Sequence, residues 1–154
     1  SILPAAVLLL GAPPRFRRVS IESISDSLDS AAGGGGRRKA ALEVFEGDQS
    51  AEVTVIDLPG EGEASERLGN VNRWRGQIGL APVTSQELQR SMRRIDVGAI
   101  AGDYVELVGQ SKSILGVIVD HGGKTWFLKL QGDTPLALSQ KGNFEAFVKS
   151  VRFE

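Results

Sequence analysis

The chain lacks cysteine and has only one histidine, one methionine and one tyrosine among its 154 residues. Without cysteine there is no disulfide, thiolate metal site, iron–sulfur cluster or cysteine nucleophile. The net charge is −1, whereas a general nucleic-acid-binding protein shows a strong basic excess. These absences exclude many enzyme classes and a nucleic-acid partner. The length and the 41% of hydrophobic residues suit one domain with a buried core.

A hydrophobic run long enough to cross a membrane is also missing. The apolar segment at residues 2–10 (ILPAAVLLL) is only half of the roughly 20 residues that span a bilayer. Three arginines follow it, whereas a signal peptide carries its positive charges before the apolar run. We weigh three interpretations: a buried strand, the end of a longer membrane segment, or a segment that docks on a partner.

A glycine-rich segment at residues 25–36 (SDSLDSAAGGGG) favours flexible backbone, because four successive glycines have high conformational entropy. We place a domain boundary there. Residues 1–36 are predicted to form an N-terminal extension, with one strand over 16–24. Residues 37–154 are predicted to form the compact domain.

Patterns of apolar residues predict the elements of this domain. Alternation indicates strands at 40–46, 51–58, 99–109, 113–120 and 125–131, with turns at 47–50 and 121–124. Apolar residues at three- and four-residue steps indicate helices at 65–78 and 135–150, and a short strand is expected at 151–153. Hairpins interrupted by helices point to an α+β fold, an antiparallel-rich sheet flanked by helices.

Local signals predict where two of the helices begin or end. Gly79 is well placed to end the helix over 65–78. Thr84 and Glu87 have the spacing of a capping box, so a short helix should follow. In that helix we expect Leu88, Met92 and Ile95 to face the core.

Charge is distributed in blocks. Residues 43–66 carry eight acidic residues and no basic one, whereas residues 67–95 carry six arginines and one acidic residue. Such polarity fits a protein that docks in one orientation on a partner, and ordinary solvated faces are the simpler explanation.

Two groups of side chains are candidate partner-binding residues. The first belongs to the N-terminal extension and comprises Leu8, Leu9, Leu10, Arg15, Arg17 and Arg18. The second would form a basic face on the two helices at 65–78 and after Thr84, and comprises Arg73, Arg75, Arg93 and Arg94, with Arg90 nearby. Such a face suits an acidic partner or lipid headgroups, and the alternative is a solvated helix surface.

No motif for catalysis, a cofactor or a metal is recognisable. The chain has no GxSxG, no GxGxxG and no phosphate-binding loop. His121 lies in a DHGG segment that suits a turn better than a ligand set. Trp74 and Trp126 are expected to pack in the core. We therefore predict no catalytic, cofactor-binding or metal-binding residues.

The acidic residues do not form a recognisable cation site either. Neither the pair Asp96 and Asp103 nor the run Glu61, Glu63 and Glu66 has the spacing of a known ligand set such as an EF-hand.

Three segments resemble a family of small bacterial envelope proteins of unknown function, which are often lipoproteins. They are 69–80 (GNVNRWRGQIGL), 122–133 (GGKTWFLKLQGD) and 141–153 (KGNFEAFVKSVRF), in the family's order and spacing. The resemblance covers residues 37–153 and implies a Mog/PsbP-like α/β/α sandwich without catalytic residues. The lipobox cysteine that such relatives carry is missing from this chain.

From this resemblance we expect a non-catalytic accessory or structural subunit that docks on a larger membrane-associated complex at the periplasmic side of the cell envelope. The most concrete form of this expectation is a photosynthetic or electron-transfer complex, since PsbP is an accessory subunit of a photosynthetic membrane complex. Its partners would be protein subunits, with contact at the membrane surface. The alternative is a soluble periplasmic module that binds a small ligand or a metal near His121, Trp126 or Tyr104.

Overall fold

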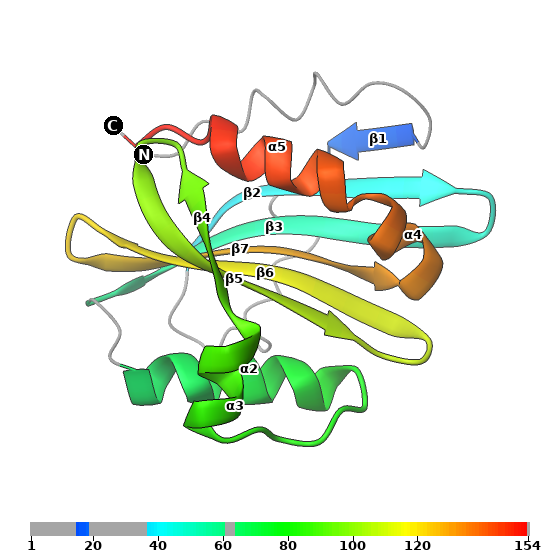
Figure 1. Ribbon diagram of the computed structural model, residues 1–154. Helices are drawn as coiled ribbons and strands as arrows, with labels where there is room; N and C mark the ends of the chain where they lie inside the picture. Colours follow the sequence, from blue (N-terminus) through cyan, green and yellow to red (C-terminus); the bar gives the residue numbers. More distant parts are fainter. Residues whose placement is uncertain (1–14, 19–36, 61–63, 154) are drawn as a thin grey trace.

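One seven-stranded sheet dominates the computed structural model, which describes residues 15–18, 37–60 and 64–153 (Figure 1). All neighbouring strands are antiparallel, in the order β1-β2-β3-β7-β6-β5-β4. The strands are β1 (Arg15–Arg18), β2 (Arg37–Glu46), β3 (Gln49–Pro59), β4 (Arg93–Val97), β5 (Ile100–Val108), β6 (Lys112–His121) and β7 (Lys124–Asp133).

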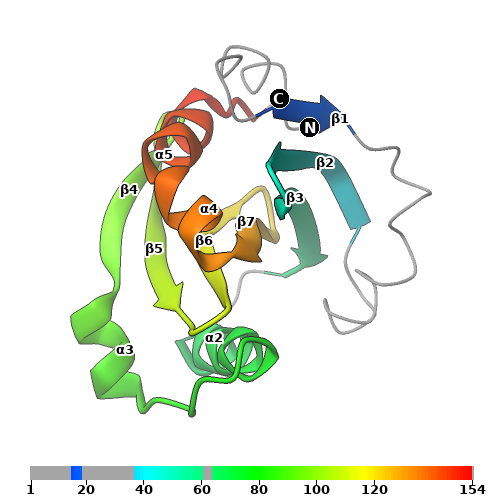
Figure 2. The ribbon, with the colours of Figure 1, turned by 90° about the vertical axis from the view of Figure 1, so that its right-hand side faces the viewer.

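Helices cover both faces of this sheet. On one face lie α2 (Ala64–Gln77) and α3 (Ser85–Ser91), and on the other lie α4 (Thr134–Ser139) and α5 (Lys141–Ser150) (Figures 1 and 2). The predicted α+β class, an antiparallel sheet flanked by helices, is confirmed. No helix in the described ranges is long and apolar enough to cross a membrane.

Tight turns fix the register of the hairpins. Between β6 and β7, His121 pairs with Lys124, and both intervening glycines have positive φ angles of 63° and 74°. Positive φ at both central residues is the requirement of a type I′ turn, which matches the twist of the flanking strands. The expected turn at 121–124 is therefore confirmed, and His121 lies at the end of β6.

The core has two parts because most of β6 is buried on both faces. Towards α4 and α5, alternate residues of the central strands pack on Phe144 and Phe147. Towards α2 and α3, the other alternate residues pack around Trp74 and Leu88. The expectation that Trp74 and Trp126 belong to the core is confirmed, since they are 3% and 4% exposed.

The helix boundaries are confirmed in part. Gly79, with φ of 81°, follows the end of α2, and the amide of Leu80 donates back to the carbonyl of Arg75 at 2.8 Å. The capping box is formed by reciprocal bonds of 3.2 and 3.0 Å between Thr84 and Glu87.

The expected extension of the second helix to Ile95 is wrong. Helix α3 ends at Ser91, Met92 is extended, and the next five residues form the edge strand β4. Met92 and Ile95 are three residues apart, which fits a helix, but Ile95 and Val97 also alternate with charged residues as in a strand. Both of these side chains are buried on the face covered by α5.

The C-terminal elements also differ from expectation. The single helix over 135–150 is divided into α4 and α5 at the buried Gln140, and the final strand is reduced to one bridge residue, Phe153.

Strand β1 belongs to the predicted extension and pairs with β2 at the sheet edge. Leu8, Leu9 and Leu10 lie outside the described residues, and the domain boundary at residue 36 stays a prediction.

Candidate functional site

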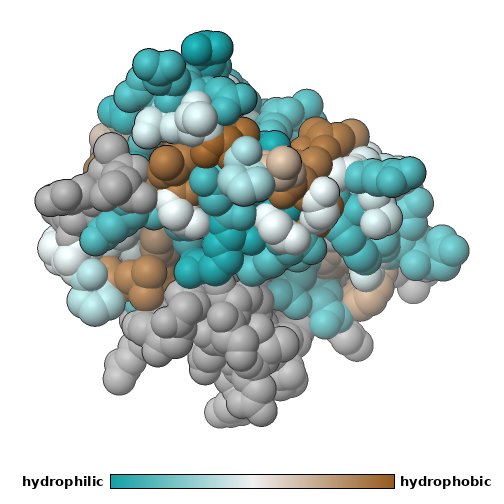
Figure 3. Space-filling model, turned by 90° about the horizontal axis from the view of Figure 1, so that it is seen from below, coloured by the Kyte–Doolittle hydropathy of each residue, from teal (hydrophilic) through white to brown (hydrophobic). Residues whose placement is uncertain are grey.

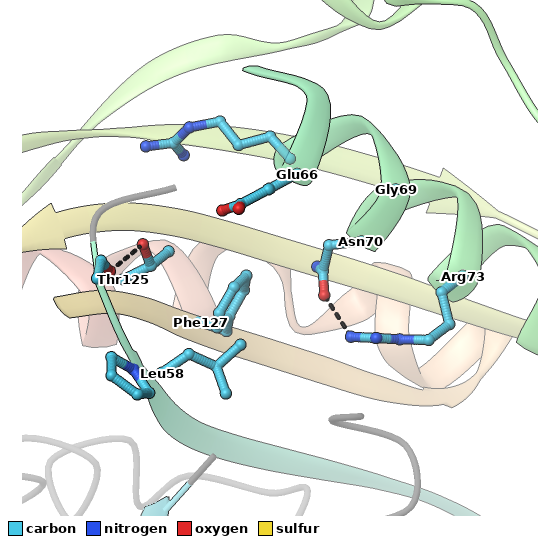
Figure 4. A pocket seen from close by; sticks show the side chains of 10 residues that line it. Leu58, Glu66, Gly69, Asn70, Arg73, Thr125 and Phe127 are labelled. Carbon is cyan, nitrogen blue, oxygen red and sulfur yellow. Dashed lines mark hydrogen bonds between the residues drawn. The ribbon is translucent and has the colours of Figure 1, made fainter. Parts of the chain in front are cut away.

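A cavity of about 580 Å³ lies between the first half of α2 and the ends of β3 and β7 (Figure 4). The surrounding face of the molecule is largely hydrophilic, with hydrophobic patches between polar residues (Figure 3). The cavity is a feature of this face that could take up a ligand.

The sheet side of the cavity is mainly apolar. Phe127 of β7 forms part of its lining, beside Leu58 and Pro59 of β3. Phe127 meets Trp74 edge to face, with ring centroids 6.2 Å apart and planes at 84°. This contact joins the lining to the core beneath α2 and holds the ring in place.

The helix side of the cavity contains a buried amide with unused donors. Asn70 is 9% exposed, and its Oδ1 accepts from Arg73 Nη2 at 2.5 Å. Its Nδ2 is buried and has no hydrogen-bond partner within the described part of the chain. Figure 4 shows Asn70 reaching from α2 towards the strand of Phe127, with the bond to Arg73 dashed.

A neighbouring asparagine on the same helix shows the contrast. Asn72 donates from Nδ2 to the carbonyl of Val83 at 3.0 Å, and its Oδ1 accepts from the amide of Val83 at 2.8 Å. Both ends of this side chain are therefore used to hold the loop after α2. Asn70 lines the cavity, and it differs from Asn72 because its Nδ2 has no hydrogen-bond partner among the described residues.

A network of two arginines and two aspartates fixes the other end of the cavity. Arg67 lies 2.6 Å from Asp120 and 3.2 Å from Asp103, and Arg94 lies 2.9 Å from Asp103. The hydroxyl of Thr125 lies 2.8 Å from the Asp120 carboxylate. The charge of Arg67 is thus balanced by carboxylates that belong to the sheet.

Arg73 is placed differently. It lines the cavity on the exposed side of α2, and no carboxylate in the described ranges pairs with it. On the same face of the sheet, burial lowers the pKa of Lys129 to about 8, with the charge of Arg73 acting in the same direction and Glu52 opposing it. Arg73 is therefore a positive charge on the cavity wall that forms no ion pair with a described carboxylate.

The predicted basic face on two helices is wrong. Arg93 and Arg94 lie on strand β4, where neighbouring residues point to opposite faces. Arg93 contacts Glu145 of α5 at 2.5 Å and lies 4.2 Å from the ring centroid of Tyr104. Arg94 instead joins the Asp103 network on the α2 side.

The remaining candidate arginines lie on two separate elements, α2 and β1. Arg75 donates from Nε to the carbonyl of Ala81 at 2.6 Å and so holds the loop after α2. Arg15, Arg17 and Arg18 lie on the edge strand β1. A role in binding a partner stays a prediction for all of these arginines.

The cavity is on the opposite face of the sheet from the pocket expected near Tyr104, Trp126 and His121. Tyr104 and Trp126 are 1% and 4% exposed in the core towards α4 and α5, and His121 stacks on Phe153 with ring centroids 4.5 Å apart. Neighbouring residues in a strand face opposite sides, so Phe127 reaches the cavity where Trp126 does not.

Asn70 was missed, although the sequence holds a signal for it. It stands four residues before Trp74, which puts a polar amide on the buried stripe of the helix. Buried amides are normally satisfied, so such a position has a structural or a ligand-binding reason.

No group of three potential metal ligands occurs in the described ranges.

Comparisons with known proteins add little about function. No family model matches the chain, and no curated protein matches it. A solved structure of LpqN, described as involved in cell envelope biogenesis of Mycobacterium tuberculosis, is similar over 92% of this chain and 85% of that chain. The sequence identity is 10% and the TM-score is 0.35, so no activity or residue role is transferred. None of these findings supports a photosynthetic or electron-transfer complex.

Proposed function

We propose that the protein is a non-catalytic binding module of the cell envelope that holds a small molecule between α2 and the sheet. The observation that carries the proposal is Asn70, which lines the cavity and whose buried Nδ2 lacks a hydrogen-bond partner in the described structure. Leaving a buried donor unsatisfied costs about 1–3 kcal/mol, which a ligand acceptor would recover.

The size and lining of the cavity support this proposal. Its volume of about 580 Å³ lies within the range of small-molecule pockets, roughly 300–1,000 Å³. Such pockets combine apolar walls with a few polar groups that orient the ligand, as Phe127 and Asn70 do here. The envelope location is supported by the three segments that resemble envelope proteins, and the non-catalytic role by the lack of a catalytic motif in the sequence.

Filling the cavity from α2 should weaken binding. Gly69 lines the cavity, and a Cβ added there would meet nothing within 4 Å, so the backbone leaves room for the substitution Gly69→Leu. We expect binding of aromatic probes such as 3-phenylpropionate to weaken at least about tenfold, as a blocked pocket implies. The measurement is a titration of the ¹⁵N-labelled full chain, followed by the chemical shifts of Asn70 and Phe127.

Gly76→Leu is the matched control for this experiment. Gly76 lies seven residues further along α2, also has no atom within 4 Å of an added Cβ, and does not line the cavity. Replacing glycine in a helix interior improves helix propensity by up to about 1 kcal/mol, so both variants should fold. Equal binding by the two variants would place the ligand elsewhere.

Docking on a larger membrane-associated complex is the second candidate function. It is favoured by the apolar run at 2–10 and by Arg15, Arg17 and Arg18, which the structure places on the edge strand β1. This candidate rests on the N-terminal extension rather than on the cavity, so the two functions can be tested separately.

Removing residues 1–14 should release the protein from such a complex while strand β1 is retained. Replacing Leu8, Leu9 and Leu10 together by serine should do the same, because apolar burial drives docking. Cross-linking in native envelopes, with identification of the attached subunits, measures the effect. Unchanged cross-links in both variants would show that the extension does not dock the protein.

A further inference from the structure

We infer that the cavity binds a small amphiphilic anion, whose anionic oxygen lies between the Asn70 amide and the Arg73 guanidinium and whose apolar body lies on Phe127. The inference rests on the proposed binding function and specifies the chemistry of the ligand. Carboxylate and phosphate headgroups share this chemistry, and the experiment distinguishes them.

The hydrogen bond between Arg73 and Asn70 fixes which donors are available. A guanidinium can only donate, so the Asn70 atom 2.5 Å from Arg73 Nη2 must be the carbonyl oxygen Oδ1. The amide nitrogen is then the atom left over, with two N–H groups and no acceptor among the described residues. Only a ligand atom that accepts hydrogen bonds can satisfy it, which excludes an ammonium group at this point.

The charges around the amide favour an anionic acceptor over a neutral one. Arg67 is balanced by Asp103 and Asp120, whereas Arg73 has no such carboxylate within the described structure. A neutral carbonyl would satisfy Asn70 and leave the charge of Arg73 unbalanced. An anionic oxygen satisfies both, and charge-assisted hydrogen bonds are roughly twice as strong as neutral ones.

The neighbouring ionisable groups are of both signs. Lys129 lies close enough to feel the charges of both Arg73 and Glu52, which act on its pKa in opposite directions. Glu66 also lines the cavity and is exposed to solvent. Solvent screens the exposed Glu66 and the exposed Arg73 alike, but only Arg73 is hydrogen-bonded to the Asn70 amide and is therefore held beside it.

The opposite wall requires an apolar body on the ligand. Phe127 and Leu58 are half-buried, and they face the helix across the cavity (Figure 4). An inorganic ion would leave these side chains against water, whereas an alkyl or aromatic body would bury them. The ligand is therefore an amphiphile rather than a free phosphate or sulfate.

Four probes with the same aromatic body test the inference on the full chain. They are 3-phenylpropionate, 3-phenylpropyl phosphate, 3-phenylpropionamide and 3-phenylpropylamine, titrated against ¹⁵N-labelled protein. We expect both anions to bind at least about tenfold more tightly than the amide, and the amine not to shift Asn70. The order of the two anions identifies the preferred headgroup. If the amide binds as tightly as the anions, the inference fails and the pocket remains; if no probe binds, the proposed function fails.

Asn70→Asp tests the donor directly. Aspartate keeps the size of the side chain and an acceptor for Arg73, but it replaces the N–H donors by a negative oxygen. Binding of 3-phenylpropionate should fall at least about tenfold. Asn143→Asp on α5, at the opposite face of the sheet, makes the same change in net charge and should not affect binding. Equal binding by wild type and Asn70→Asp would overturn the inference.

Arg73→Gln provides a test that does not depend on Asn70. It removes one positive charge from an exposed position and should reduce the preference for 3-phenylpropionate over 3-phenylpropionamide to near unity. A general loosening of α2 would weaken both probes alike and leave their ratio unchanged. That result would assign Arg73 a structural role and contradict the inference.

Discussion

Replacing Lys129 by methionine should stabilise the protein at pH 7 by about 2 kcal/mol, since burying an ammonium is costly. Lys129 is 6% exposed, and burial lowers its pKa from 10.5 to about 8, with Arg73 contributing and Glu52 opposing. The lowered pKa corresponds to about 3 kcal/mol of destabilisation below pH 8. The methionine variant should recover somewhat less than this, because it also loses the cation–π contact between Lys129 Nζ and the Trp74 ring, whose centroid is 5.7 Å away.

The pH dependence gives a second measure of the same effect. In the unfolded chain the lysine keeps its proton up to about pH 10.5, whereas in the folded chain it keeps it only up to about pH 8. The unfolded state therefore binds more protons between these values, so the stability of the wild type should rise as the pH rises from 8. In the methionine variant this rise should be absent.

Urea unfolding at pH 7 and pH 9.5 measures both effects, and the difference between wild type and variant removes the contribution of other groups. Lys149→Met on the exposed side of α5 is the control and should change stability by less than about 0.5 kcal/mol. A Lys129→Met protein that is less stable than the wild type at pH 7 would contradict the argument.

Local patterns in the sequence predict much of the fold. The apolar stripe of α2, the capping box at Thr84 and the glycine turn after His121 are all formed as expected. Each of these features depends on residues close in sequence. Strand β4 was missed because its apolar residues fit both a helical and a strand period over so short a stretch.

The candidate site could not be predicted in the same way, since its parts come from distant segments. Asn70 lies on the buried stripe of α2, but only the distance between α2 and β7 decides whether its amide finds a partner. Arg67 and Arg73 look alike in the sequence, and the structure separates them by giving Asp103 and Asp120 to Arg67 alone. Tertiary packing therefore decides which arginine is available to a ligand.

Gly116 is another position whose role depends on a distant residue. A glycine inside the apolar strand β6 suggests close approach of another group, without saying which. The structure shows that this group is the indole of Trp74 from α2, since a Cβ at Gly116 would lie 2.4 Å from Cζ3 and 3.0 Å from Cη2. The absence of a side chain at Gly116 thus allows α2 to pack on the sheet.

Gly116→Ala should accordingly destabilise the protein by about 1–3 kcal/mol, the usual cost of overpacking a core. Trp74 is 3% exposed, so its ring cannot yield without a shift of α2. Trp74→Phe removes the outer ring of the indole, and in that background the added methyl group should cost far less. The double variant should therefore be more stable than the sum of the single changes predicts, by about 1 kcal/mol or more.

Thermal and urea unfolding of the wild type, the two single variants and the double variant measure this coupling. Gly142→Ala in α5, where an added Cβ meets nothing within 4 Å, is the control and should stabilise the helix by up to about 1 kcal/mol. If Gly116→Ala were as stable as the wild type, or if the two changes were strictly additive, α2 would not be held by this contact.

Because Asn70 lies one turn before Trp74 on α2, the same contact also sets how far its amide stands from Phe127. Gly116→Ala should therefore also weaken binding of 3-phenylpropionate.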